Sequence, residues 1–105
     1  MTTERWLPFE YREFYDVPRL ILVEMDDKAL LLDSPFDQEA DEYTDSFRVY
    51  SLSMASATEL RGRTSWNGAA ALGTFIASIP VSEVEFDPSR RRSLGASVLE
   101  RHGIR

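Results

Sequence analysis

Six acidic side chains lie close together in the middle of the chain, in a segment that contains no lysine, arginine or histidine. They are Asp33, Asp37, Glu39, Asp41, Glu42 and Asp45. Such a cluster repels itself unless a cation, a basic partner or solvent compensates its charge. The chemistry that these carboxylates could perform is therefore cation binding, acid–base catalysis or recognition of a basic surface.

Calcium is the first cation to consider, because Asp37, Glu39 and Asp41 stand at alternate positions and could converge on a hard ion. The match to an EF-hand loop that begins at Asp37 then fails. Its sixth position is Glu42, where the loop needs glycine, and its twelfth is Arg48, where the loop needs glutamate. The sequence therefore predicts no bound metal and no cofactor.

Two carboxyl groups can also divide general acid and general base work when burial raises the pKa of one of them. Asp33 is the best candidate for the buried member, because it ends a strongly apolar segment. An aspartate before Ser34-Pro35 is equally typical of a turn. A carboxylate-based hydrolase that depends on a divalent metal is therefore the alternative hypothesis, with no residue assigned to a catalytic role.

Aromatic side chains are interspersed with these acids, and this favours a binding surface. Phe36, Tyr43 and Phe47 could serve as apolar anchors for a basic protein partner that the carboxylates attract. We expect the binding residues to be Phe36, Asp37, Glu39, Asp41, Glu42, Tyr43 and Asp45. The main hypothesis is thus a small acidic domain that acts as a non-catalytic protein-interaction module.

Two alternatives need no partner. The acidic segment could be a solvated surface loop. It could also pair internally with Arg61, Arg63 and Arg90 to Arg92, in which case the polarity of the sequence would disappear in the fold. Single ion pairs at a surface contribute ~0–1 kcal/mol, so such a network would add little stability.

Other function classes lack their residues. The absence of cysteine removes thiol catalysis, thiolate metal sites and disulfides. There is no glycine-rich phosphate loop followed by lysine, and the one histidine, His102, stands at an expected helix end that suits its charge. A net charge of −6 and an isoelectric point near 4.7 argue against nucleic-acid binding.

The elements that must position the acidic segment are mainly strands. Apolar alternation predicts strands over residues 10–16, 19–25, 29–33, 47–52, 74–79 and 81–87. Pro80 should mark an edge, a bulge or a bend. Residues 34–45 are expected to form a loop between two of these strands.

Two helices complete the prediction. The S-x-x-E pattern from Ser56 to Glu59 predicts that a short helix begins at Ser56. A C-terminal helix should begin at Asp87, or near Ser93 because cations oppose a helix start, and should end at Gly103. The fold class is therefore α+β, with a mainly antiparallel sheet or small partly open barrel of five to six strands and a C-terminal helix.

The central hairpin should be buried on both faces. Leu20 and Leu22 fall on one side of their strand, whereas Ile21 and Val23 fall on the other. Helices, barrel closure or a second subunit could cover these faces, and we expect the C-terminal helix and residues 65–72 to do so. A homodimer and a small-molecule pocket in the sheet remain further hypotheses.

We expect one globular domain, residues 1–105, in the cytoplasm and without membrane contact. The N-terminal residues are charged and lack the apolar region of a secretory signal. The longest uncharged stretch, residues 64–82, is too polar to span a bilayer and is expected in the core. A chain without cysteine also fits a reducing compartment.

Overall fold

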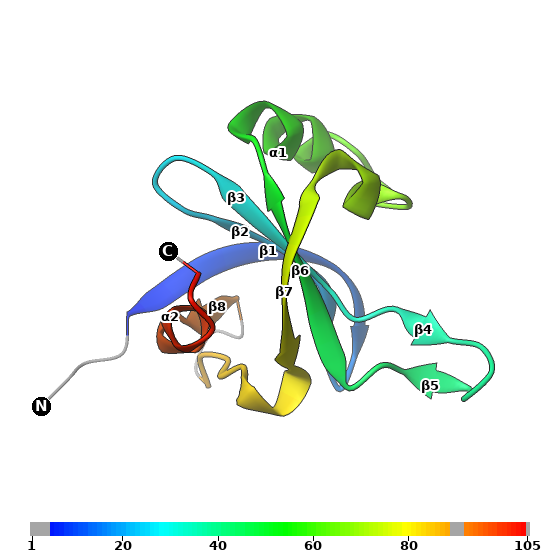
Figure 1. The fold of residues 1–105 in the computed structure, drawn as a ribbon. Helices are drawn as coiled ribbons and strands as arrows, with labels where there is room; N and C mark the ends of the chain where they lie inside the picture. The colour runs from blue at the N-terminus through cyan, green and yellow to red at the C-terminus, as the bar shows by residue number, and fades with distance from the viewer. Residues whose placement is uncertain (1–4, 89–91, 105) are drawn as a thin grey trace, which may run out of the picture.

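A six-stranded antiparallel sheet organises the fold (Figure 1). The computed structural model describes residues 5–88 and 92–104. The strands of this sheet are β1 (Trp6–Tyr15), β2 (Val17–Glu24), β3 (Ala29–Asp33), β6 (Ser46–Leu52), β7 (Thr74–Pro80) and β8 (Ser93–Gly95). They follow the order β7-β6-β3-β2-β1-β8 and form a half-barrel, which together with the short helices gives the predicted α+β class.

The predicted hairpin of β2 and β3 lies at the centre of the sheet. Leu22 pairs with Leu31, and Val23 pairs with Leu30. Successive side chains of a strand face opposite sides of its sheet, and all apolar side chains from residue 20 to 23 and from 29 to 32 are buried. The prediction that this hairpin is buried on both faces is confirmed.

Elements of the chain itself cover the two faces. On one face Ile21 and Leu32 pack into a cluster with Leu99 of α2 (Ser97–Arg101). The opposite face is covered by α1 (Met54–Arg61), by Trp66 and by the short 3₁₀ helix η1 (Ala69–Leu72). The C-terminal helix and the segment around Trp66 thus contribute the expected cover, and α1 adds to it.

The structure corrects the prediction for residues 81–103. Instead of a strand over residues 81–87, the chain forms the 3₁₀ helix η2 (Val81–Glu83) and then only a single bridge from Phe86 to Leu94. The C-terminal helix begins at Ser97 rather than at Asp87 or near Ser93. Ser93–Gly95 is β8, because Leu94 is fully buried against the free edge of β1. Arg90 and Arg91 lie outside the described residues.

The first helix also starts earlier than predicted. Ser53 caps α1, and its Oγ accepts a hydrogen bond of 3.1 Å from the backbone N–H of Ser56. Ser56 therefore lies in the first turn instead of capping it. The helix ends at Arg61, where Gly62 follows as the C-cap. No helix in the described ranges is long and apolar enough to cross a bilayer.

Residues 34–45 are not the simple loop that we expected. β4 (Phe36–Asp37) pairs with β5 (Glu42–Tyr43), and the two strands extend away from the sheet (Figure 1). We call residues 36–43 the acidic arm. Its turn is closed by Asp37, whose Oδ1 accepts hydrogen bonds from the N–H groups of Glu39 and Ala40 at 3.0 and 3.3 Å.

Candidate functional site

The acidic arm is anchored at its base by a buried serine. Ser34 is fully buried, and its Oγ donates a hydrogen bond of 2.8 Å to the carbonyl oxygen of Thr44. The N–H of Thr44 donates to the carbonyl oxygen of Pro35 at 2.9 Å, and a guanidinium N–H of Arg19 donates to Ser34 Oγ at 3.2 Å. These contacts join both ends of the arm to β2 and β3, while the arm itself stays in solvent.

An exposed group of aromatic rings lies beside this base. Tyr15 stacks on Tyr43 with ring centroids 5.5 Å apart, and Phe36 meets Tyr43 edge to face at 5.2 Å. We call Tyr15, Phe36 and Tyr43 the ring cluster. Tyr15 is 60% exposed and Phe36 is 47% exposed, although both rings are already fixed by their contacts with Tyr43. The cluster is therefore a pre-ordered apolar surface among carboxylates.

The structure brings together only part of the predicted binding set. Phe36 and Tyr43 are in contact, and the carboxylates of the set are all exposed to solvent: Asp37, Glu39, Asp41, Glu42 and Asp45. Phe47 is not an anchor. Its side chain is fully buried opposite Ile79, because it alternates with Val49 onto the face beneath α2.

The third ring of the cluster, Tyr15, was missed by the sequence analysis. Phe14 and Tyr15 are adjacent in β1, so they point to opposite sides of the strand. A signal was therefore present in the sequence, because two adjacent aromatic side chains cannot both pack on the same face. Asp16, with a φ of +64°, reverses the chain directly after Tyr15 and carries β2 back along β1.

The carboxylates of the arm do not form a metal site. In the described ranges no three acidic or histidine side chains come together to hold an ion. Asp37, where the rejected match to a calcium loop would begin, closes the turn of the arm through its Oδ1. The alternative hypothesis of a metal-dependent hydrolase therefore gains no support from this segment.

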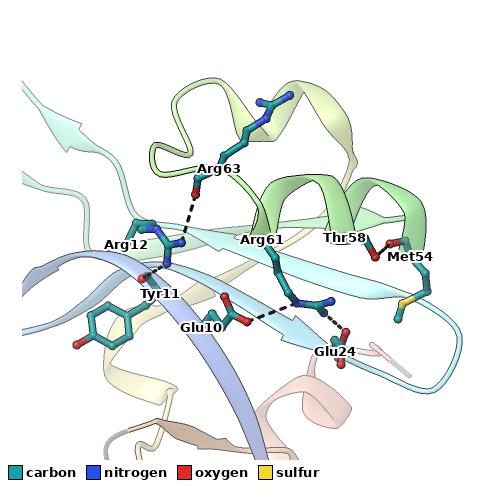
Figure 2. A network of polar contacts seen from close by, with 8 residues as sticks. All are labelled: Glu10, Tyr11, Arg12, Glu24, Met54, Thr58, Arg61 and Arg63. Carbon is teal, nitrogen blue, oxygen red and sulfur yellow. Dashed lines mark hydrogen bonds and ion pairs between the residues drawn. The ribbon is translucent and has the colours of Figure 1, made fainter.

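Internal pairing of the arm with Arg61 and Arg63 is also wrong. Arg61 forms ion pairs with Glu10 and Glu24 on the sheet (Figure 2). Arg63, just after α1, pairs with Glu59 of that helix. Both pairings keep these guanidinium groups at α1 and the adjoining strands. The backbone carbonyl of Arg92 accepts from Phe9 N–H at the start of β1, far along that strand from Tyr15.

A partly open pocket of about 310 Å³ lies between the base of the arm and the segment that precedes η1. Its walls include the carboxyl groups of Glu13 and Asp33 and the rings of Phe36, Tyr43 and Trp66. Its volume lies at the lower end of the usual range for ligand cavities, ~300–1,000 Å³. The pocket therefore suits one small chemical group.

Asp33 is the perturbed titratable group of this pocket. Burial raises the pKa of its carboxyl above 3.8, and the nearby charge of Glu13 raises it further. Arg48, which pairs with Asp33 across β3 and β6, lowers this pKa and only partly opposes the other two effects. The side chain of Asp33 makes no hydrogen bond or ion pair with any described residue.

Trp66 forms the wall opposite the arm. It is 2% exposed, and the guanidinium of Arg12 lies over its ring, 4.3 Å from the ring centroid. That guanidinium also donates to the carbonyl oxygens of Tyr11, Thr64 and Arg63, two of which are drawn in Figure 2. The Nε1 of Trp66 is buried and has no acceptor in the described part of the chain.

Glu13 and Trp66 could not be assigned to one site from the sequence. Glu13 reaches the pocket at a backbone φ of +61°, which interrupts the regular pairing of β1 with β2. Trp66 was expected in the core, and it contributes both to the core and to the pocket wall. Comparison with family models, curated proteins and solved structures finds no match for this chain, so the geometry alone must carry the functional argument.

Proposed function

We propose that this protein is a non-catalytic interaction module that docks a basic protein partner on the acidic arm and its ring cluster. The single observation that carries the proposal is the pair of exposed rings, Tyr15 and Phe36, held against Tyr43 beside an arm of solvent-exposed carboxylates. Aromatic anchors of this kind supply most of the binding energy in protein interfaces.

The charge of the arm adds long-range attraction to this contact. Carboxylates at a rim steer an oppositely charged partner and raise its association rate, whereas the desolvated anchors at the centre set the dissociation rate. Because the rings are already in contact with one another, less conformational entropy is lost when a partner covers them. A lysine- or arginine-rich surface with one apolar residue between its cations would match this arrangement.

The test uses a short peptide of alternating lysine and glycine that carries one leucine, titrated into the protein by calorimetry. Replacing Tyr15 with serine should weaken binding by about tenfold, because an anchor that loses its apolar area typically costs more than ~1 kcal/mol. Phe75→Ser is the matched control. Phe75 is also exposed, but it lies on the edge strand β7, which β6, β3 and β2 separate from Tyr15 on β1. Equal losses in both variants would contradict the proposal.

A second copy of the chain is another candidate partner, and β7 is the element that favours it. β7 is an edge strand, and it lies within the uncharged stretch of residues 64–82. Phe75 and Ile76 on this strand are 55% and 42% exposed. An edge strand that lacks charges can pair with the same strand of a second copy, even though the net charge of −6 makes two copies repel each other elsewhere.

Sedimentation velocity over a range of protein concentrations tests this homodimer. The wild-type chain should form dimers that Phe75→Lys converts to monomers, because a charge on each edge blocks the approach of two strands. A wild-type protein that stays monomeric would exclude the homodimer. We place both interactions in the cytoplasm, since a chain without cysteine needs no oxidising compartment.

A further inference from the structure

The pocket at the base of the acidic arm has an unbalanced negative charge. Its described walls contain two carboxyl groups, Glu13 and Asp33, and no lysine, arginine or histidine. Asp33 is half-buried and has no hydrogen-bond donor or ion-pair partner in the described ranges. A carboxylate in this position is costly unless a cation enters and compensates it.

The arginines around the pocket do not supply that cation. The guanidinium of Arg12 lies over Trp66 and donates to three backbone carbonyls. Arg19 lies over Tyr43 at 5.1 Å and donates to the carbonyl oxygens of Tyr15 and Thr44 and to Ser34 Oγ. Neither forms an ion pair with a described carboxylate. Arg48, which pairs with Asp33 across β3 and β6, forms no ion pair with it and only partly opposes the rise of its pKa, so the charge of the pocket is left for a ligand.

The walls favour an organic cation over a metal ion. Phe36, Tyr43 and Trp66 offer aromatic surface, which attracts alkylammonium and guanidinium groups. A hard metal ion needs more oxygen ligands than Glu13 and Asp33 offer, and no third acidic side chain joins them in the described part of the chain.

We infer that this pocket receives a single alkylammonium or guanidinium group, the end of a lysine or arginine side chain of the partner that docks on the arm. The inference rests on the proposed function, since Phe36 and Tyr43 belong both to the ring cluster and to the pocket. Glu13 and Asp33 bind the charge, the rings flank the alkyl stem, and the small volume admits one side chain. The pocket thereby makes the arm selective for a basic residue at one position of the partner.

The test follows the indole signals of ¹⁵N-labelled protein during titration with a short peptide of neutral residues around one central lysine. Trp6→Phe leaves a single indole signal and so assigns it to Trp66, since the chain has only these two tryptophans. The lysine peptide should shift the Trp66 signal in a saturable way. The same peptide with norleucine in place of lysine should not, because it keeps the alkyl stem and lacks the charge. Equal shifts from both peptides would overturn the inference.

Variants then test whether Glu13 and Asp33 are the carboxylates that bind the ammonium group. Asp33→Asn and Glu13→Gln should each lower the affinity for the lysine peptide by about tenfold, because each removes one charge-assisted contact. Asp27→Asn is the matched control, since it removes the same charge from the exposed turn between β2 and β3, outside both the arm and the pocket. A loss in Asp27→Asn as large as in Asp33→Asn would show that only net charge matters and would overturn the inference.

Butylamine is a free alkylammonium about as long as a lysine side chain. It tests whether the pocket takes a side chain of a protein partner or a free small amine. If it binds less tightly than the lysine peptide, the cation belongs to a partner side chain, as inferred. If it binds as tightly, the assignment to a partner side chain is overturned.

The same variants distinguish failure of this inference from failure of the proposed function. If Tyr15→Ser abolishes docking of the polybasic peptide while Asp33→Asn leaves it unchanged, the function stands and the pocket assignment falls. If the polybasic peptide does not dock but the lysine peptide shifts the Trp66 signal, the proposed function falls and the cation pocket stands alone.

Discussion

Two antiparallel hairpins lie next to each other in this chain, separated only by Ser34 and Pro35, and they use their side chains in opposite ways. In the hairpin of β2 and β3, the apolar side chains are buried on both faces of the sheet. In the acidic arm, every side chain from residue 36 to 42 is exposed. Strand pairing alone thus does not decide whether a hairpin serves stability or recognition.

The difference lies in what maintains each hairpin. Burying a leucine side chain contributes about 1.5–3 kcal/mol, and the central hairpin is stabilised by several such side chains. The arm depends on the turn at Asp37, the ring contacts of Tyr43 and the hydrogen bonds of Ser34. Its exposed side chains contribute little to folding and remain available to a partner.

The largest expected effect belongs to the central hairpin. Leu31→Ala should lower the free energy of unfolding by about 2–5 kcal/mol, because Leu31 is fully buried and its truncation leaves a cavity between β3 and α1. Urea denaturation followed by circular dichroism measures this loss. Glu39→Ala in the arm should stay within about 0.5 kcal/mol of wild type. A comparable loss from Glu39→Ala would erase the contrast between the two hairpins.

The joint between the hairpins should show the next largest effect. Ser34→Ala removes the buried hydroxyl that donates to the carbonyl oxygen of Thr44, and it should cost about 1–3 kcal/mol. The backbone amide of Thr44, which bonds to Pro35, should also exchange with solvent faster in this variant. If neither stability nor exchange changes, the arm is not anchored through Ser34.

How far the sequence predicts this fold follows from the same contrast. The central hairpin could be predicted because its leucines occupy both faces, a pattern that only a doubly covered strand tolerates. The arm could not be predicted as paired strands, since residues 36–43 have no apolar alternation and depend on the turn at Asp37. β8 was assigned to a helix because its pairing with β1 joins residues 85 to 89 positions apart.

The candidate site was predictable only in part. The arm acids, Phe36 and Tyr43 follow from local sequence, because they lie within one short segment. Glu13, Tyr15 and Trp66 join them only through the reversal at Asp16 and the packing of the segment before η1. A sequence pattern reports neighbours along the chain, whereas the pocket is made by three segments that meet in space.

A smaller effect is expected at the far end of the central hairpin. Arg61 pairs with Glu10 and Glu24, and all three side chains are accessible to solvent (Figure 2). Arg61→Ala should therefore lower the free energy of unfolding by no more than about 1 kcal/mol. The loss should shrink in high salt, which screens exposed charges. Thermal unfolding at low and high salt measures it, and a salt-independent loss would show that Arg61 acts through packing instead.

The smallest effect is expected at Asp33, where the two hairpins meet. Its pKa is raised above 3.8 by burial and then by Glu13, so the folded state binds the proton more tightly than the unfolded state does. The stability that Asp33 contributes must therefore decrease as the pH rises from about 3.8 through the raised pKa. Asp33→Asn carries no such charge, so its melting temperature relative to wild type should rise across this window and then level off.

Melting curves of both proteins from about pH 3 to pH 8 measure this difference, since other groups titrate alike in both and cancel. If the melting temperature of Asp33→Asn relative to wild type instead falls as the pH rises, the Asp33 carboxylate has a compensating partner inside the fold. Adding the lysine peptide at neutral pH should reverse the order, because a ligand that binds the folded wild type about ten times more tightly than the variant stabilises the wild type more. Asp33 would then weaken the free protein slightly at the one position where the charge of a partner is needed.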